Sequence, residues 1–262
     1  MTSHPSQSDN RPRQPEVDLT VFVPCYNEEK LIARTLDTIR RATAAFNFTY
    51  EVLIYNDGST DRSSEIISDY IRSHHLEGQF ELVSPARNLG IGVNYFLAAE
   101  RGKGKFFVVF FGDNSEPVES MELVFKLMGK ADVIIPYIDS RLLPSRFNTD
   151  HRSLVRRFFS INFARLVRLF SGHQIRYFNG FVMHRRDLVL KYRGTAYGLG
   201  YQAELLTQIL DEPGISFLEV KVTCADRESG TPTAFKPKNV VSVVGSLGRI
   251  LYRRLTWSPA KS

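Results

Sequence analysis

The chain has 262 residues, of which 43% are apolar and 24% carry a charge, and its formal net charge is +6. This composition is that of a globular protein with a substantial core, and it excludes a chain that is disordered throughout. The longest clear apolar run, residues 106–111, is far shorter than the roughly 18 residues that cross a bilayer, so we expect no membrane-spanning helix.

Residues 1–16 are polar, contain three prolines and lack an apolar stretch. We predict that they form a disordered tail and not a secretory leader, because a leader requires an apolar segment. A cytoplasmic protein is therefore expected. The globular domain is predicted to cover residues 17–237, and residues 238–262 are predicted to form a basic amphipathic helix and a tail.

In the first half of the chain, short apolar runs alternate with helical patterns. Strands are predicted at 19–23, 51–55, 80–84 and 105–111, each followed by turn or helix-capping residues. Between the first three strands, apolar residues recur at the spacing of a helix. This alternation predicts an α/β fold with a mostly parallel central sheet and helices on both of its faces.

The second half of the chain has a less regular pattern, with an arginine-rich link after its first strand. It ends in a predicted helix. The elements that we expect are a strand at 133–136, a long helix at 152–170, a strand at 181–184, a helix at 201–210, a strand at 215–222 and a helix at 239–255.

Two polar loops follow the first two predicted strands. Residues 24–29 read Pro-Cys-Tyr-Asn-Glu-Glu, and residues 56–61 read Asn-Asp-Gly-Ser-Thr-Asp. Open α/β sheets bind ligands at the carboxyl ends of their strands, and both loops carry carboxylates beside a helix start. The first hypothesis is therefore a nucleotide pocket. The alternative is that Glu28 and Asp57 only cap helices and form turns.

Taken together, these two loops resemble the opening of the family 2 glycosyltransferases, and the resemblance extends from about Val17 to the C-terminal helix. It implies a GT-A fold and a donor that is a nucleotide-diphosphate sugar, UDP- or GDP-linked. It also implies that Asp57 accepts a hydrogen bond from a base N–H, which suits an ionised carboxylate because it is only an acceptor. The implied nucleotide-binding residues are Pro24, Tyr26, Glu28, Asn56, Asp57, Arg87 and Gly112.

The metal-binding motif of the family is only partly present. The family has Asp-x-Asp at the end of the fourth strand, and the matching segment here, residues 111–117, has Phe111 at the first position and Asp113 at the second. Mg²⁺ or Mn²⁺ can be held by one or two carboxylates together with substrate phosphates and water, so we expect Asp113 to bind a divalent cation. Asn114 and Glu116 are candidates to assist, and the alternative role of Asp113 is to cap the next helix.

The position of the catalytic base is also changed. Family members that glycosylate hydroxyl groups usually carry an acid at the start of a late helix, because an alcohol must lose its proton as it attacks. Here Gln202 takes that position, and an amide cannot accept the proton. Either Glu204, on the same helix, acts as the base, or the acceptor arrives already ionised.

A phosphate acceptor is ionised at neutral pH and needs no strong base. This favours the branch of the family that resembles dolichol-phosphate mannose synthase, which glycosylates a polyprenyl phosphate at a membrane surface. Seven arginines lie between residues 141 and 168 against one acidic residue, and arginine matches phosphate oxygens well. The alternative is a solvated cationic face. The implied acceptor- and phosphate-binding residues are Arg141, Arg146, Arg227 and Lys236.

The predicted C-terminal helix has an apolar stripe beside several arginines, with Val240, Val244 and Leu247 among its apolar positions. A basic amphipathic helix of this kind can lie in a lipid interface, which predicts a peripheral contact with the inner face of the membrane. The alternative is that the stripe packs against the core.

We therefore predict an inverting glycosyltransferase that moves a hexose from a nucleotide sugar to a polyprenyl phosphate. The first alternative is a transferase that acts on a hydroxyl of a glycan in polysaccharide biosynthesis, with Glu204 as base. The second is a nucleotide-sugar-binding protein without catalysis, since Phe111 replaces an expected metal ligand. No nucleic-acid partner is expected, because no known binding module is present. The base, the sugar and the oligomeric state are not specified by the sequence.

Overall fold

The computed structural model describes residues 16–139, 154–193, 198–224 and 237–256. In this part of the chain, seven strands form one sheet in the order β3-β2-β1-β4-β6-β5-β7. All neighbouring strands run parallel except β6, which is antiparallel to β4 and to β5. The strands are β1 Val17–Cys25, β2 Tyr50–Asn56, β3 Phe80–Val83, β4 Gly104–Val109, β5 Val133–Ile138, β6 Met183–Arg185 and β7 Phe217–Val222.

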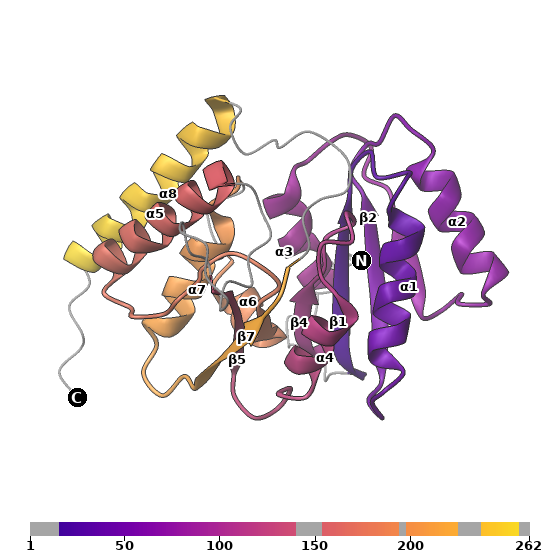
Figure 1. Cartoon of the computed structure of the whole chain (residues 1–262), viewed down its shortest axis with the longest axis horizontal. Coiled ribbons are helices and arrows are strands. Elements are labelled where there is room, and N and C mark those ends of the chain that lie inside the picture. Colours follow the sequence, from indigo (N-terminus) through magenta and orange to yellow (C-terminus); the bar gives the residue numbers. More distant parts are fainter. Residues whose placement is uncertain (1–15, 140–153, 194–197, 225–236, 257–262) are drawn as a thin grey trace, which may run out of the picture.

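Helices cover both faces of the sheet (Figure 1). They are α1 Ile32–Thr43, α2 Ser63–Ser73, α3 Ile91–Arg101, α4 Val118–Phe125, α5 Leu154–Ser171, α6 Arg186–Lys191, α7 Tyr201–Leu210 and α8 Pro237–Thr256. One core lies between the sheet and α1, α2 and α4, and a second core lies between the opposite face and α3, α5, α6, α7 and α8.

The central strand β1 contributes to both cores. Its side chains alternate between the two faces, as the two-residue period of a strand requires. Leu19, Val21 and Val23 belong to the core beneath α1, α2 and α4, whereas Phe22 belongs to the opposite core. All four side chains are fully buried. A run that is apolar at nearly every position is what a parallel strand with two covered faces needs.

The predicted α/β fold, with its mostly parallel sheet and C-terminal helix, is confirmed. The bounds of strand β6 differ from the prediction, because β6 begins at Met183 and not at residue 181. Phe181 and Val182 are apolar because they are buried in the two cores before the strand begins. Helix α6 is not among the predicted elements. The predicted start of helix α5, at 152–153, lies outside the described residues.

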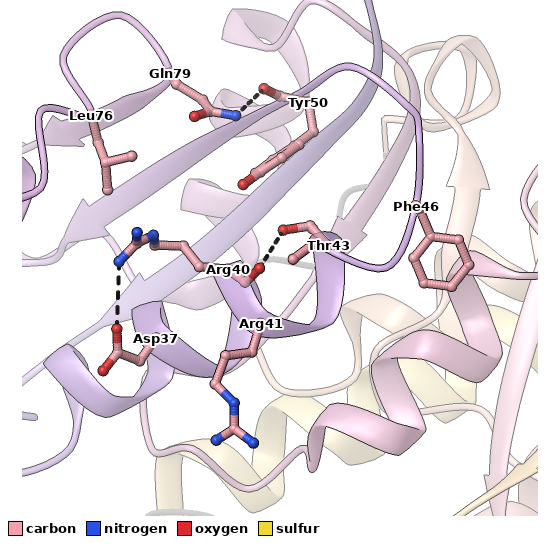
Figure 2. A pocket seen from close by; sticks show the side chains of 9 residues that line it. Asp37, Arg40, Arg41, Thr43, Phe46, Tyr50, Leu76 and Gln79 are labelled. Carbon is pink, nitrogen blue, oxygen red and sulfur yellow. Dashed lines mark hydrogen bonds and ion pairs between the residues drawn. The ribbon is translucent and has the colours of Figure 1, made fainter.

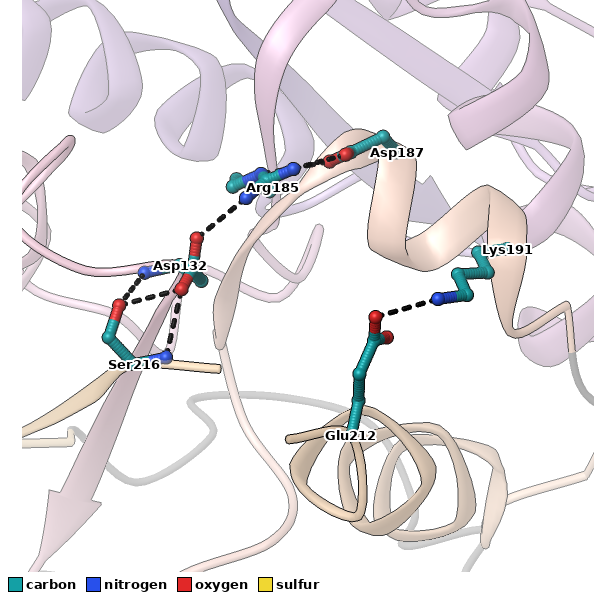
Figure 3. A network of polar contacts seen from close by, with 6 residues as sticks. All are labelled: Asp132, Arg185, Asp187, Lys191, Glu212 and Ser216. Carbon is teal, nitrogen blue, oxygen red and sulfur yellow. Dashed lines mark hydrogen bonds and ion pairs between the residues drawn. The ribbon is translucent and has the colours of Figure 1, made fainter. Parts of the chain in front are cut away.

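A polar network ties together the three strands of the second half of the sheet (Figure 3). Asp132, just before β5, accepts hydrogen bonds from the Ser216 N–H and hydroxyl at 2.8 and 2.6 Å and from Arg185 Nη1 at 2.8 Å. Ser216 directly precedes β7, and Arg185 ends β6. These donors, first among them Ser216, hold the pKa of the Asp132 carboxyl at about 2.

We expect Asp132→Asn to destabilise the protein by about 2 kcal/mol at pH 7, because a lowered carboxyl pKa contributes about 1.4 kcal/mol per unit. The stabilisation is present above the unfolded-state pKa and is lost as the pH falls from about 4 to about 2. Urea unfolding at pH 7 and at pH 2.5 measures the change. The control is Asp187→Asn, which removes a more exposed partner of the same Arg185 and should change stability little. An equal loss for Asp132→Asn at both pH values would contradict the prediction.

Candidate functional site

Three loops meet around the carboxyl end of the central strand β1. The Asp57 N–H, after β2, donates to the Cys25 carbonyl at 2.9 Å, and the Gly112 N–H, after β4, donates to the Pro24 carbonyl at 3.2 Å. Strands β2 and β4 are the two neighbours of β1 in the sheet. The sequence-predicted residues that follow these three strands are therefore brought to one edge of the sheet, as the resemblance implies.

The loops after β1 and β2 are joined by reciprocal hydrogen bonds. The Asn27 N–H donates to the Ser59 hydroxyl at 2.9 Å, and the Thr60 N–H donates to Asn27 Oδ1 at 2.8 Å. The Glu28 N–H donates to the Ser63 hydroxyl at 2.9 Å. Asn27 has a φ of 56°, a left-handed conformation that asparagine tolerates better than most residues. The two motifs therefore form one structural unit, although about thirty residues separate them.

Glu28 and Tyr26 occupy different environments in the first loop. The Glu28 side chain is 9% exposed, whereas Tyr26 is 50% exposed. Gly112 packs closely on this loop, since a Cβ at its position would lie 2.9 Å from the Pro24 carbonyl oxygen and 3.6 Å from Glu28 Cγ. A side chain at residue 112 would push the β4 loop away from the first loop. Among the predicted nucleotide contacts of the first loop, exposed Tyr26 offers an aromatic ring on which a base could stack.

Asp57 anchors the loop that follows β3. Its carboxylate oxygens accept hydrogen bonds from the Leu89 N–H at 2.7 Å and the Gly90 N–H at 2.9 Å, and its carbonyl accepts one from the Asn88 side chain at 2.8 Å. A carboxylate has further lone pairs, so the predicted contact with a base N–H is compatible with this anchoring. Arg87 lies exposed in the same loop.

Asn56, the last residue of β2, is buried and turns its side chain inward to its own loop. Its Oδ1 accepts a hydrogen bond from the Ser59 N–H at 3.3 Å. Asn56 therefore shapes the second loop, and its predicted contact with a nucleotide stays a prediction.

The turn that carries Asp113 is fixed from both sides. The Thr38 hydroxyl on α1 donates to Asn114 Oδ1 at 2.8 Å, and Asn114 has a φ of 53°. On the other side, Glu116 Oε2 accepts the Phe111 N–H at 3.2 Å. Burial and, secondly, the charge of Asp113 raise the pKa of the Glu116 carboxyl to about 8. The Glu116 carboxyl therefore holds its proton to a higher pH than an exposed glutamate does.

The residues of this turn fit a divalent cation that the donor's phosphates help to hold. Within the described ranges, no group of three His, Cys, Asp or Glu side chains is arranged to bind a metal. Mg²⁺ and Mn²⁺ do not need such a group, since one or two carboxylates suffice when substrate phosphates and water complete the shell. Asp113 is partly exposed on this turn, and its Oδ1 accepts a hydrogen bond from the Ser115 N–H at 3.3 Å. Its role as a metal ligand stays a prediction.

The two predicted residues of helix α7 have different partners. Gln202 pairs with the backbone of Gly180, donating to its carbonyl at 2.8 Å and accepting from its N–H at 2.9 Å. Glu204 is 1% exposed and accepts a hydrogen bond from Arg249 Nε on α8 at 2.9 Å. The ion pair gives Glu204 a structural role, and its role as a base stays a prediction.

The four predicted acceptor- and phosphate-binding residues lie outside the described residues. They are Arg141, Arg146, Arg227 and Lys236. Their roles stay predictions.

A surface hollow of about 560 Å³ lies at the other edge of the sheet (Figure 2). Its lining includes Arg40 near the end of α1, Tyr50 at the start of β2 and Gln79 just before β3. Because parallel strands begin at this edge, the hollow is remote from the loops around β1, and it is not the predicted donor site.

Ser63 and Thr38 are contributors to the site that the sequence reasoning missed. Ser63 is fully buried and Thr38 is 8% exposed. Each hydroxyl reaches a loop far away in sequence, at Glu28 and Asn114 respectively. A polar residue on the buried face of a helix was the available signal, because such a group needs a partner.

The comparisons with known proteins agree with this geometry. A family model described as glycosyl transferase family 2 matches residues 20–190. The dolichyl-phosphate beta-glucosyltransferase ALG5C of Trichomonas vaginalis is 27% identical over 169 residues, covering 62% of this chain and 49% of that protein. The dolichyl-phosphate beta-glucosyltransferase of Drosophila melanogaster is 29% identical over 173 residues, covering 62% and 52%. The chain thus spans about half the length of these relatives.

Solved structures share the fold at low sequence identity. Glucosyl-3-phosphoglycerate synthase from Mycobacterium tuberculosis, in complex with Mn²⁺, UDP-glucose and phosphoglyceric acid, superposes with a TM-score of 0.64 at 18% identity, covering 89% of this chain and 80% of that chain. S. aureus TarS gives a TM-score of 0.60 at 16% identity, covering 93% and 40%. The structure has the GT-A fold, and since the family model matches well over half of its residues, the chain belongs to glycosyl transferase family 2.

Proposed function

We propose that this protein is an inverting glycosyltransferase that moves a hexose from a nucleotide-diphosphate sugar to a polyprenyl phosphate at the cytosolic face of a membrane. The observation that carries the proposal is the pairing of Gln202 with Gly180. The position of the expected base is occupied by Gln202, and its amide is not basic enough to accept a proton. Both polar groups of that amide are also engaged by the Gly180 backbone. An acceptor that is ionised beforehand needs no proton acceptor there.

The relatives support the same acceptor class, because several of them are dolichyl-phosphate beta-glucosyltransferases. UDP-glucose is the first donor to test, since it is bound in structural neighbours of this chain. A nucleotide sugar would lie across the three loops around β1, with the base near Tyr26 and Asp57 and the diphosphate near Asp113.

The reaction needs one displacement. An oxygen of the acceptor phosphate attacks the anomeric carbon from the side opposite to the nucleoside diphosphate. The bond from that carbon to the diphosphate oxygen breaks, and its electron pair leaves with the diphosphate. A divalent cation, when bound, offsets the charge that builds up on the leaving group. Asp113 would hold that cation, and the rigid loops around β1 orient the donor for in-line attack.

The acceptor class is tested by supplying UDP-glucose and GDP-mannose with either a polyprenyl phosphate or a glycan. We expect glycosylation of the polyprenyl phosphate. Product only on the hydroxyl acceptor would favour the transferase that acts on glycans. Tight nucleotide binding with no transfer to any acceptor, with Mg²⁺ or Mn²⁺ present, would favour a binding protein without catalysis.

Asp113→Asn is expected to lower the transfer rate by about 100-fold, because the loss of the protein's carboxylate removes several kcal/mol of charge stabilisation. It should also weaken Mn²⁺ binding in the presence of UDP, measured by electron paramagnetic resonance. The matched control is Glu119→Gln, which removes an exposed acid at the start of α4. Equal Mn²⁺ affinity in both variants would contradict the role of Asp113.

Glu204→Gln is expected to retain most of the transfer to polyprenyl phosphate, because an ionised acceptor needs no base. Gln can still accept the hydrogen bond from Arg249, so the variant should fold, with a melting temperature lowered by the loss of the ion pair. Rates are compared at a temperature where circular dichroism shows both proteins folded. A folded variant that has lost all activity would support Glu204 as the base and would count against the phosphate acceptor.

Helices α5 and α8 lie side by side at the end of the molecule away from α1 and α2 (Figure 1). No helix within the described ranges is long and apolar enough to cross a membrane. The pair nevertheless carries most of the large apolar side chains that the described structure exposes, and Arg165 and Arg254 are exposed on the same helices. These apolar side chains are Leu154, Val155, Phe158, Phe159, Leu166 and Leu169 on α5 and Val240, Val241, Val244, Tyr252 and Leu255 on α8.

This helix pair supports a peripheral contact with an anionic membrane, where each nearby basic residue contributes about 1 kcal/mol. The double variant Val241→Glu and Val244→Glu should bind phosphatidylglycerol vesicles at least tenfold more weakly in a sedimentation assay, because it places charges on the exposed face of α8. The control is Leu123→Glu on α4, which changes an exposed apolar residue elsewhere. Unchanged vesicle binding, or a dimer that the double variant dissociates, would contradict the membrane contact.

A further inference from the structure

The Gln202 side chain and the backbone N–H and C=O of Gly180 form a closed pair of hydrogen bonds. The amide oxygen accepts from the Gly180 N–H at 2.9 Å, and the amide nitrogen donates to the Gly180 carbonyl at 2.8 Å. Gln202 is 7% exposed, so water competes little for these groups and both bonds are strengthened by the low local dielectric. One side chain therefore satisfies both backbone polar groups of a residue 22 positions away.

The backbone conformation of Gly180 needs such external support. Gly180 has a φ of 145°, a conformation that is essentially restricted to glycine. A Cβ at this position would also lie 3.2 Å from the Tyr177 ring. Glycine permits this conformation but does not select it, because glycine is the most flexible residue. The two bonds from Gln202 select it.

The segment that contains Gly180 lies beside the strand that leads to the Asp113 turn. The Phe181 and Phe110 rings pack with their centroids 5.6 Å apart. Phe110 follows the last residue of β4 and is three residues before Asp113. In the same segment, the side-chain oxygen of Asn179 is buried without a hydrogen-bond partner among the described residues. A buried acceptor without a partner is costly, and a donor group supplied by a ligand would remove that cost.

We propose that Gln202 is a positioning residue for the donor sugar: its side-chain amide fixes the Gly180 backbone so that the 179–181 segment lies against the hexose of the bound nucleotide sugar. This inference rests on the proposed function in taking a nucleotide-diphosphate hexose as the donor. Gln202 acts through Gly180 and does not touch the reacting atoms.

The pairing requires a side chain that donates and accepts at once. Glutamate has the same shape as glutamine, but an ionised carboxylate only accepts. In Gln202→Glu one carboxylate oxygen would still accept the Gly180 N–H, and the other would face the Gly180 carbonyl oxygen at close range and repel it. A protonated glutamate has an O–H that can donate to that carbonyl, so lowering the pH should restore both hydrogen bonds to Gly180.

The test compares affinities for UDP-glucose and for UDP, measured by calorimetry with Mn²⁺ at pH 5.5 and pH 8 and normalised to the unmodified protein. Gln202→Met has a similar volume and no hydrogen bonds, and we expect it to bind UDP-glucose about tenfold more weakly at both pH values and UDP unchanged. Gln202→Glu should be equally weak at pH 8 and close to the unmodified protein at pH 5.5. The control is Gln208→Glu on the same helix, with no change expected.

Three results would overturn the inference. The first is UDP-glucose binding by Gln202→Glu that does not change with pH relative to the unmodified protein. The second is an equal loss of UDP and UDP-glucose affinity, which indicates general damage to the fold. The third is a gain of transfer to a glycan hydroxyl by Gln202→Glu, which would make residue 202 the site of a base. If Gln202→Met does not fold, the UDP-glucose affinities of Gln202→Glu at the two pH values still test the inference.

The binding assay contains no acceptor, so it separates this inference from the proposed function. Absence of hexose transfer to polyprenyl phosphate would contradict the proposed function, but it would not contradict the positioning role of Gln202. Failure of the unmodified protein to bind UDP-glucose or GDP-mannose would contradict the proposed donor. Normal donor binding by the unmodified protein, together with a UDP-glucose affinity of Gln202→Glu that does not change with pH, would contradict only the positioning role of Gln202.

Discussion

The site depends on the hydrogen bonds that join the three loops around the end of β1. The backbone carbonyls of Pro24 and Cys25 accept N–H groups from the loops on either side, and Ser63 links the first loop to the start of α2. Loops at the end of a sheet are otherwise the most mobile part of such a fold. Joined in this way, the loops form a preorganised surface. Such a surface can bind a donor without the free-energy cost of ordering the loops.

The same loops also hold the acidic side chains of the site. Asp57 uses its carboxylate to hold the loop after β3, and burial raises the pKa of the Glu116 carboxyl beside Asp113. Asp113 is the partly exposed carboxylate of its turn. One such group is compatible with a cation that is held mainly by the donor's phosphates, so metal and donor would bind together. The missing first aspartate of the family motif, replaced by Phe111, is consistent with this arrangement.

Helix α8 is attached to the domain by polar contacts as well as by apolar packing. Arg249 bonds to the buried Glu204, and Arg253 bonds to Asp211, both on or next to α7. Two of the arginines that give the C-terminal stretch its basic character are therefore engaged internally. The exposed apolar side chains on the same helix, such as Val241 and Leu255, lie outside these contacts. Helix α8 thus combines an inward polar attachment with an outward apolar surface.

The sequence by itself determined the fold class, the family and the grouping of the loop residues at one edge of the sheet. It could do so because strand and helix periods are local, and because parallel strands bring their carboxyl ends together. It did not reveal helix α6, the late start of β6 or the partners of Ser63, Gln202 and Glu204. Only the tertiary structure decided these, because a side chain's hydrogen-bond partner depends on which distant backbone lies within about 3 Å, and no local pattern encodes that distance.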